Sequence, residues 1–282
     1  MIVAPMAGTL YVVATPLGNL EDVTLRALRV LREVDLVACE DTRRTRKLLQ
    51  YNEITTPATS YYEHNELWKG ERILERLRAG QDVALVSDAG TPGISDPGFR
   101  LVRDARAAGL SVVPVPGPNA AIAALSVSGL PSDRFRFVGF LPARGGQRRR
   151  AIAELASVRE TLVFYEAPVR VVDTLSELLS GLGDRPAFLC REATKLHEEY
   201  RLASLGALHH ELRARDSVKG EIVLVVAGAP RQASDENPRK LFAALTAQGH
   251  TRREAVKETA RLLGRHARDI YREVLDDDEE DA

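Results

Sequence analysis

The sequence predicts an α/β protein with two α/β domains and a small all-helical C-terminal domain. Short apolar runs alternate with amphipathic stretches through most of the chain, which is the pattern of strands and crossover helices in a largely parallel sheet. The length of 282 residues exceeds the size at which a single core keeps growing. Polar segments at 128–133 and 228–237 indicate linkers between the domains.

Composition excludes several classes of protein. With 44% hydrophobic and 28% charged residues, the chain is typical of a globular protein, and no apolar run approaches the roughly 20 residues that a membrane span needs. The N-terminus has no basic lead and no convincing cleavage site, so we expect a cytoplasmic protein without a membrane partner. Cys39 and Cys190 are isolated in apolar runs, which favours packed thiols and no metal site.

The net charge of −1 hides an uneven distribution. An acidic tail at 276–282 holds six carboxylates, and without them the 40 acidic residues fall to 34 against 39 basic ones. Basic side chains also cluster at 43–47 and 144–150. Such runs are commonly solvated helix faces, but they also suit a phosphate-bearing partner, and charge alone leaves both interpretations open.

The first half of the chain is predicted to alternate strands and helices. Expected strands cover 9–14, 35–39, 84–86 and 112–115, and expected helices begin near Asp22 or Thr24, cover 67–78 and 100–108, and start again after Asn119. Ligands of such sheets sit outside the carboxyl ends of the strands. The loops that follow the strands are therefore the candidate binding segments.

The loop at 87–98 is the strongest of these candidates. It holds two carboxylates among glycines, serines and prolines. Its glycines permit backbone angles that other residues avoid, whereas Pro92 and Pro97 fix theirs, so the loop can keep one contour against a ligand. Connections in such units usually take about 2–6 residues, so we interpret this longer loop as a pocket wall and not as an ordinary turn.

Two other strand ends could bind a ligand or only cap a helix. Glu40 and Asp41 stand where a strand ends and a helix begins, with bases one turn later. Helix capping and a catalytic or RNA-facing cluster fit this pattern comparably well. Asn119 would cap the helix that follows 112–115, and the free N–H groups of its first turn could also contact a ligand.

The second half repeats the pattern and ends in helices. Expected strands cover 135–141, 161–165, 186–190 and 222–227, and Pro168 can occupy the first turn of a helix that runs to about residue 180. Three further helices, at 238–247, 253–263 and 265–275, resemble a helix-turn-helix unit, although three short helices also form generic packing modules. The expected domains are therefore 1–128, 133–229 and 237–275, followed by the tail at 276–282.

Seven motifs in a fixed order carry a resemblance to a known family. They are ATPLGNLEDVT at 14–24, ACEDTRRTRKLL at 38–49, SDAGTPGISDPG at 87–98, PVPGPNA at 114–120, FYEAPVR at 164–170, CREATKLHEE at 190–199 and KGEIVLV at 219–225. The chain resembles the tetrapyrrole methylase superfamily and, within it, the bacterial enzymes that methylate the 2′-oxygen of a cytidine ribose in small-subunit (16S) ribosomal RNA. Its C-terminal helices resemble an extension of those RNA enzymes that cobalamin-pathway members generally lack.

The resemblance implies a homodimeric methyltransferase that binds S-adenosyl-L-methionine in a cleft between its two α/β domains and acts on 16S rRNA within the 30S subunit. Departures from the family pattern are small: Asn119 and Ala167 stand where serine is common, and Ala193 where leucine is common. They affect only particular side-chain hydrogen bonds. Carried over by position, the cofactor would contact Pro16, Leu17, Asp88, Ala89, Gly90, Gly93, Ile94, Asn119, Ala120, Tyr165, Glu166, Ala167 and Gly220.

Methyl transfer to a ribose hydroxyl needs an oriented acceptor oxygen. Because that hydroxyl is a weak acid, a base or a cation beside the developing alkoxide would help, and no metal is required. We hypothesise that Lys195 or Arg43 stabilises the oxygen, and that Glu40, Asp41 or Glu166 accepts the proton or positions the cation. The expected phosphate contacts of the RNA are Arg144, Arg148, Arg149 and Arg150, with the C-terminal helices as a second platform.

Two other functions remain consistent with the sequence. A small-molecule C-methyltransferase acting on corrin or tetrapyrrole precursors would share the fold and the cofactor, but the arginine runs and the C-terminal extension count against it. A non-catalytic RNA-binding protein would use helix-turn-helix contacts alone. The second alternative predicts no saturable cofactor site.

Overall fold

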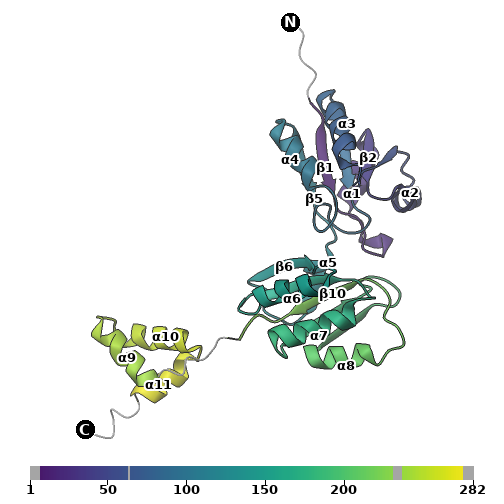
Figure 1. Ribbon diagram of the computed structural model, residues 1–282. Coiled ribbons are helices and arrows are strands. Elements are labelled where there is room, and N and C mark those ends of the chain that lie inside the picture. The colour runs from purple at the N-terminus through teal and green to yellow at the C-terminus, as the bar shows by residue number, and fades with distance from the viewer. Residues whose placement is uncertain (1–6, 63, 231–236, 276–282) are drawn as a thin grey trace. The chain divides into compact units, whose positions relative to one another are not determined.

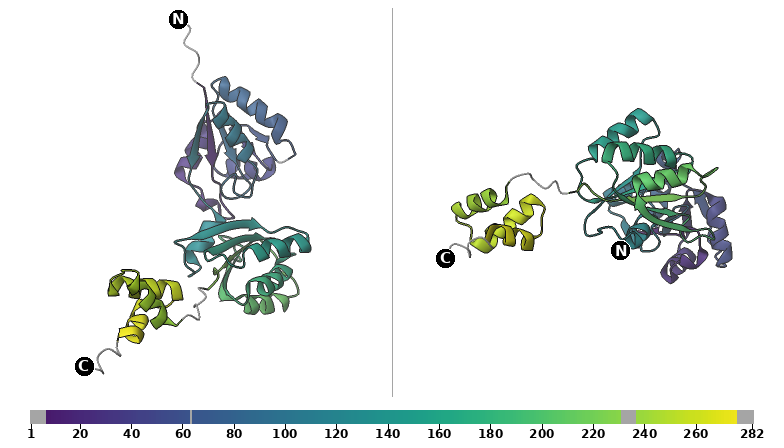
Figure 2. Two further views of the ribbon diagram at one scale, coloured as in Figure 1. Left: turned by 60° about the vertical axis from the view of Figure 1, so that its left-hand side comes forward. Right: turned by 90° about the horizontal axis from the view of Figure 1, so that it is seen from below.

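The computed structural model describes residues 7–62, 64–230 and 237–275. The chain divides into two compact units (Figures 1 and 2). The first unit comprises residues 1–156 and 160–227 and contains two five-stranded sheets, and the second comprises 157–159 and 228–282. The acidic tail expected at 276–282 lies outside the described residues, as do residues 231–236 of the expected second linker.

The first sheet is entirely parallel, with the strand order β3-β2-β4-β1-β5. The sequence predicts four of its strands but not β3, an edge strand too short to show any periodicity. The five strands are β1 (Thr9–Val13), β2 (Leu36–Cys39), β3 (Ala58–Ser60), β4 (Val83–Val86) and β5 (Ser111–Val115).

Helices cover both faces of this sheet. Alternate buried strand residues pack on one face with α3 (Glu66–Arg78) and α4 (Phe99–Ala107). The intervening residues pack on the other face with α1 (Leu25–Glu33) and α2 (Thr42–Tyr51). This is the expected arrangement for a parallel sheet, and it leaves the loops at the carboxyl ends of the strands to bind a ligand.

The second sheet is mixed, with the order β6-β7-β10-β8-β9. Its first two strands, β6 (Phe135–Phe140) and β7 (Thr161–Glu166), are parallel. In contrast, β10 (Ile222–Val226) runs antiparallel to both β7 and β8 (Pro186–Arg191). The reversal places the start of β10 beside the ends of its two neighbours, so that all three contribute residues at the same edge of the sheet.

The helices that pack on the second sheet indicate a different domain boundary from the one predicted. Helix α7 (Val171–Leu182) packs against α6 (Gly145–Glu154) and α8 (Leu205–Arg213). Helix α5 (Ala120–Val127) is within the expected domain 1–128, but its buried residues share a core with β7, β8 and β10 of the second sheet. A boundary before α5 fits these contacts better, and the division of the first unit into two domains remains a prediction.

Two further details of the second half differ from prediction. Pro168 precedes α7 in a turn, so the helix starts at Val171 and not at the proline. Strand β9 (Glu199–Ser204) and α8 were not predicted, because a short edge strand that runs directly into a helix has no turn residues to mark it. Cys39 and Cys190 are buried free thiols, as expected.

The second unit contains the three predicted helices, α9 (Pro238–Ala247), α10 (Arg252–Leu263) and α11 (Ala267–Leu275). A capping box of Thr251 and Glu254 starts α10, and Gly264 in a left-handed conformation ends it. Apolar residues of α10 and α11 form a small core. In the described ranges, no helix is long and apolar enough to cross a membrane.

Candidate active site

A cavity of about 420 Å³ is lined by residues from both sheets of the first unit, and this volume suits a small-molecule ligand. The first sheet contributes loops that follow its strands, and the second contributes the ends of β6, β7 and β8 and the start of β10. Most residues predicted to contact a cofactor line this cavity, namely Leu17, Asp88, Ala89, Gly90, Ile94, Asn119, Ala120, Tyr165, Glu166 and Ala167.

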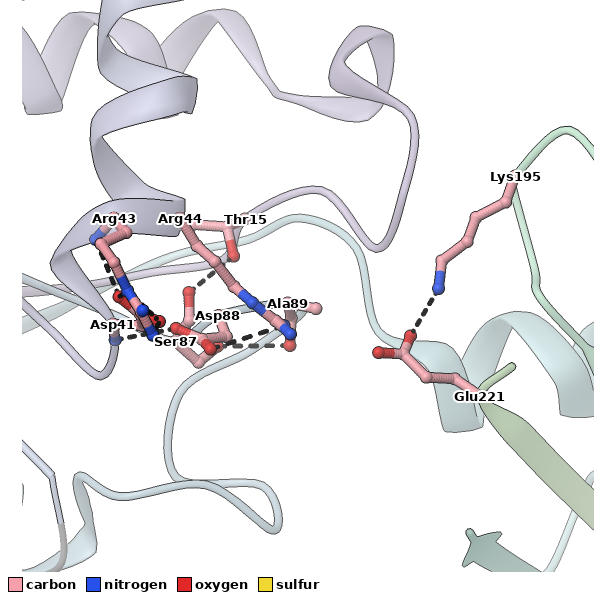
Figure 3. Close-up of polar contacts among 9 residues, drawn as sticks. All are labelled: Thr15, Asp41, Arg43, Arg44, Ser87, Asp88, Ala89, Lys195 and Glu221. Carbon is pink, nitrogen blue, oxygen red and sulfur yellow. Dashed lines mark hydrogen bonds and ion pairs between the residues drawn. The ribbon is translucent and has the colours of Figure 1, made fainter. Parts of the chain in front are cut away.

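The loop at 87–98 is held against the loop that follows β1. Thr15 and Gly90 exchange two backbone hydrogen bonds of 2.8 and 2.9 Å, and the Thr15 hydroxyl donates to the carbonyl oxygen of Ser87 at 3.1 Å (Figure 3). Gly90 has a φ of 82°, and a Cβ atom there would approach Leu17 to 3.3 Å. The loop therefore keeps a fixed contour at the cavity, and glycine is required to build it.

Three of the predicted cofactor residues do not line this cavity. Pro16 and Gly93 lie in loops whose neighbouring residues do line it. Gly220 lines a second cavity, of about 410 Å³, together with Arg191, His197, Arg215 and Lys219. The sequence analysis missed this basic cavity, although Arg191, His197 and Lys219 stand within two of the quoted motifs.

The first sheet presents three carboxylates to the main cavity: Glu40, Asp88 and Asp96. Asp88 accepts the backbone N–H of Asp41 at 2.9 Å and lies 3.5 Å from the guanidinium of Arg44 (Figure 3). Burial, and then the charge of Glu40, raises the pKa of Asp96 to about 6. Burial, and then the charge of Asp88, likewise raises the pKa of Glu40. These mutually repelling acids favour a cationic ligand.

Glu166 is a structural residue in this arrangement. Its side chain is only 1% exposed, and its carboxylate accepts hydrogen bonds from Arg170 at 2.6 Å, from Thr174 at 2.5 Å and from the N–H of Ala167 at 2.7 Å. Donors in the turn after β7 and in α7 therefore occupy the lone pairs of the Glu166 carboxylate. The geometry therefore argues against Glu166 as the proton acceptor that the sequence analysis considered.

Asp41 and Arg43 form the cap of α2. Asp41 accepts the N–H of Arg43 at 2.8 Å and pairs with its guanidinium at 2.7 Å (Figure 3), and these hydrogen bonds lower the pKa of Asp41 to about 2. Neither residue lines the cavity, and the Arg43 side chain is 86% exposed. Both residues therefore fit the helix-capping interpretation, and this argues against the catalytic roles hypothesised for them.

Lys195 is connected to the cavity by an ion pair with a carboxylate that lines it. Its ammonium lies 3.1 Å from Glu221, which lines the cavity (Figure 3). The same ammonium lies 2.7 Å from Glu192. Burial disfavours the charge on Lys195, but the hydrogen bonds to these two carboxylates outweigh it and raise the pKa of the ammonium. Lys195 itself does not line the cavity, and its ion pair with Glu221 connects it to the cavity wall.

The four arginines predicted to bind RNA differ in their environments. Arg148 is 6% exposed and forms hydrogen bonds of 2.7 and 3.1 Å with Glu177, so the structure argues against it as a phosphate contact. Arg144, Arg149 and Arg150 are exposed on or next to α6. The prediction therefore applies to these three.

Several residues that line the cavity were not assigned to the site from the sequence, among them Arg44, Asp96, Phe140 and Glu221. Arg44, Asp96 and Glu221 stand inside quoted motifs, so their motif membership could have identified them. Phe140 ends β6 and meets Tyr165 edge to face at 5.7 Å between ring centroids, a contact that no local pattern indicates. No group of three or more His, Cys, Asp or Glu residues could hold a metal ion in the described part of the chain.

These features define a class of protein, the two-sheet α/β proteins that bind a small cationic ligand. The parallel sheet contributes shaped loops at the carboxyl ends of its strands, the second sheet closes the same cavity, and acidic side chains line it. The family model for Tetrapyrrole (Corrin/Porphyrin) Methylases matches residues 9–209. The chain belongs to this family.

Relatives and solved structures agree with this assignment. The chain is 46% identical to "Ribosomal RNA small subunit methyltransferase I" of Halalkalibacterium halodurans, over 94% of this chain and 93% of that protein. It is 53% identical to the protein of the same name in Pseudomonas aeruginosa, over 82% of this chain and 83% of the relative. These relatives and the family confirm the predicted methyltransferase class and its cofactor, S-adenosyl-L-methionine.

Solved structures with lower identity share the fold. Uroporphyrin-III-C-methyltransferase from Thermus thermophilus has a TM-score of 0.57 at 24% identity, covering 78% of this chain and 94% of its own. Diphthine synthase has a TM-score of 0.60 at 17% identity, covering 78% of this chain and 90% of its own. The predicted tetrapyrrole methylase fold is thus confirmed.

Proposed function

We propose that this protein transfers the methyl group of S-adenosyl-L-methionine to the 2′-oxygen of a cytidine ribose in 16S rRNA. The observation that carries the proposal is the acidic cavity formed by both sheets, in a chain whose relatives are named small-subunit ribosomal RNA methyltransferases. We further propose that the enzyme is a cytoplasmic homodimer that needs no metal and acts on RNA within the 30S subunit. The family resemblance supports these finer points.

The residues of the cavity fit the proposed cofactor. Carboxylates on the first sheet suit a sulfonium cation, whereas Tyr165, Ile222 and Val223 offer apolar surface for a nucleoside. The glycine loop at 87–98 brings backbone groups to the wall. When bound, S-adenosyl-L-methionine supplies an electrophilic methyl group on a positively charged sulfur.

Several side chains have a supporting role at this cavity. Tyr165 accepts the N–H of Ala121 at 3.3 Å, which ties β7 to the first turn of α5. Asn119 caps α5 by accepting the N–H of Ile122 at 3.1 Å, so the first turn of α5 would meet a ligand through backbone N–H groups. Lys195 and Glu221 would position a ligand or the acceptor at the opposite wall.

The proposed RNA contacts are of two kinds. Arg144, Arg149 and Arg150 are exposed, and of these three only Arg149 forms an ion pair in the described residues, a 3.5 Å contact with Glu177. The second cavity presents the exposed His197 and Lys219 beside Gly220, one residue from the cavity-lining Glu221. Phosphate contacts at both places would position the RNA strand without reading its sequence.

The test is methyl transfer from labelled cofactor to 30S subunits isolated from cells that lack the activity, with corrin precursors assayed in parallel. We expect saturable cofactor binding and label in 16S rRNA. Label in the corrin precursors alone would support the tetrapyrrole C-methyltransferase, a candidate that the shared fold with uroporphyrin-III-C-methyltransferase keeps open. Binding of RNA without a saturable cofactor site would leave only the RNA-binding protein.

A further inference from the structure

The second cavity concentrates positive charge. It lies where the turn after β8 meets the chain before β10, and Arg191, His197, Arg215 and Lys219 line it. Among the described residues that line it, Glu192 is the only carboxylate. A concave surface with such an excess of cationic side chains favours an anion, and a cavity of about 410 Å³ has room for one.

That single carboxylate is neutralised by a lysine that does not line the cavity. One oxygen of Glu192 lies 2.7 Å from the ammonium of Lys195 and accepts the backbone N–H of Glu221 at 2.8 Å. A carboxylate engaged in this way repels an incoming anion less than a free one does. The lining therefore presents a net positive charge even with Glu192 ionised.

The two arginines of the second cavity are fixed in place by Glu199 of β9. Its carboxylate accepts hydrogen bonds from Arg191 at 2.7 Å and from Arg215 at 2.6 and 2.9 Å. Arg191 also donates to the backbone carbonyl of Lys219 at 3.1 Å and to that of His197 at 3.4 Å. It thereby ties together the two segments that carry the other bases, so the cavity is ordered before a ligand binds.

Lys219 and His197 are the groups left to meet a ligand. Both residues are exposed, and neither forms an ion pair within the part of the chain that the structure describes. The two arginines, by contrast, are already paired with carboxylates. A single exposed lysine is ordinary on a protein surface, but two unpaired bases beside two fixed guanidinium groups suit a phosphate, whose oxygens accept several hydrogen bonds at once.

A short backbone link joins this cavity to the main one. Lys219 and Gly220 line the second cavity, and the next residue, Glu221, lines the main cavity. Gly220 has a φ of 93°, and a Cβ atom there would lie 2.3 Å from the side chain of Glu192, so the link requires glycine. From Lys219 to Glu221 the backbone spans at most about 7 Å, a distance that adjoining nucleotides of one strand can cover.

We propose that the second cavity binds the phosphodiester of a nucleotide that adjoins the methylated ribose, with Lys219 and His197 as its contacts. This inference rests on the proposed transfer to a ribose in 16S rRNA. A phosphate held here fixes the register of the strand, because phosphate contacts orient a nucleic acid without reading its bases. The acceptor ribose then lies at the main cavity, one nucleotide from the anchored phosphate.

The experiment compares Lys219→Gln with Arg213→Gln, which removes an exposed positive charge from α8 outside both cavities. Affinity for 30S subunits from cells that lack the activity is measured by co-sedimentation over a range of salt concentrations. We expect Lys219→Gln to bind about fivefold more weakly at 0.1 M salt and to lower the salt slope by about 0.7. Adding His197→Gln should weaken binding further, whereas Lys219→Arg and Arg213→Gln should match the wild type.

Cofactor affinity is measured separately, by calorimetry without RNA. Because Lys219 does not line the main cavity, Lys219→Gln should bind S-adenosyl-L-methionine as the wild type does. This readout separates a loss of RNA binding from damage to the cofactor site.

The position of the phosphate is tested by ethylation interference on the 16S rRNA of the same subunits. Ethylation neutralises single phosphates, and those whose modification prevents binding are identified in the unbound fraction. With wild-type enzyme we expect interference at a phosphate that adjoins the methylated ribose. With Lys219→Gln this interference should disappear, because the group that the phosphate engages is gone, and Arg213→Gln should keep it.

A salt slope for Lys219→Gln equal to that of wild type, or interference that persists at the adjoining phosphate, would overturn the inference. So would an equal loss of affinity in Arg213→Gln, which would indicate a diffuse positive field and no site. If wild-type enzyme binds the subunits with interference that depends on Lys219 but labels no 16S rRNA, the proposed function fails while an RNA phosphate site remains, which is a different result.

Discussion

The two sheets contribute carboxylates to one cavity in different states. From the first sheet come Glu40 and Asp96, which have no ion-pair partner in the described ranges, and Asp88, which lies 3.5 Å from Arg44. From the second come Glu166, which is held by Arg170 and Thr174, and Glu221, which is held by Lys195. A buried, paired carboxylate supports the fold, whereas an unpaired one costs stability and marks a functional site. The contrast assigns structural support to the second sheet and binding of a cationic ligand to the first.

The largest expected effect is a loss of stability when a paired carboxylate of the second sheet is removed. Glu166→Ala removes a buried carboxylate and leaves Arg170 and Thr174 without their acceptor. We expect the free energy of unfolding to fall by about 3–5 kcal/mol, measured by urea denaturation followed by circular dichroism. Arg148→Ala, which breaks the pair with Glu177 at 2.7 Å, is a comparison variant outside the cavity. Unchanged stability in Glu166→Ala would contradict its structural role.

The pH dependence of stability should also separate the two sheets. Hydrogen bonds from Arg215, opposed by burial and supported by Arg191, lower the pKa of Glu199 on β9 from 4.5 to about 2. A depressed pKa stabilises the fold above pH 4.5, and this contribution of about 3 kcal/mol at most is lost as the pH falls toward 2. Acid titration of the unfolding free energy should therefore show a shallower decline for Glu199→Gln than for wild type.

The charge of Asp96 should affect the pH dependence of stability in the opposite direction. Because its pKa in the folded protein is raised to about 6, its charge opposes folding above that pH, and protonation relieves the cost as the pH falls from 6 toward 4. Asp96→Asn should accordingly raise the thermal unfolding midpoint at pH 7.5, while no such gain appears at pH 4. A lower midpoint at pH 7.5 would show that Asp96 stabilises the fold.

A smaller effect tests the glycine loop of the first sheet. Gly90 and Gly109 have similar positive φ angles of 82° and 72°, but only Gly90 lines the cavity. A Cβ atom at Gly109 would meet nothing within 4 Å. Alanine at either position should cost about 1–2 kcal/mol of stability from the left-handed backbone. Only Gly90→Ala should also weaken cofactor binding in calorimetry, and equal affinities in the two variants would remove the loop from the binding site.

The smallest effects concern RNA binding. Replacing Arg144, Arg149 and Arg150 with glutamine should lower the salt dependence of RNA affinity, by about 0.7 in slope for each lost phosphate contact. Filter binding over a range of salt concentrations measures this. Arg148→Gln should leave the slope unchanged, because its guanidinium is already paired with Glu177. A slope equal to wild type in the triple variant would identify these arginines as an ordinary solvated helix face.

Much of the fold could be predicted from local patterns. The four long strands of the first sheet, the caps at Thr24 and Asn119 and the three C-terminal helices all carry their signals in adjacent residues. What the patterns could not supply was long-range pairing. The reversal of β10 depends on contacts with β7 and β8, and α5 joins the second core through residues more than thirty positions away.

The sequence predicted where the site lies better than it predicted the role of each side chain in it. Strand ends and shaped loops indicated where the cavity is, because these features are local. Whether a carboxylate there is paired depends on distant partners, such as Thr174 for Glu166 and Lys195 for Glu221. For this reason Glu166 and Asp41 were plausible bases in the sequence, and the unpaired carboxylate of Asp96 can be recognised only when its neighbours in space are known.

The most direct test of the division between the sheets measures Asp96→Asn and Glu166→Gln side by side, as the calorimetric affinity for S-adenosyl-L-methionine and the unfolding midpoint of the same preparation. We predict that Asp96→Asn binds the cationic cofactor more weakly than wild type, with an equal or higher midpoint at pH 7.5. Glu166→Gln should keep an affinity near that of wild type with a lower midpoint, because the Glu166 carboxylate is held by Arg170 and Thr174. The reverse result, a stable Glu166→Gln that binds poorly beside an Asp96→Asn that binds as wild type does, would contradict the division of roles between the two sheets.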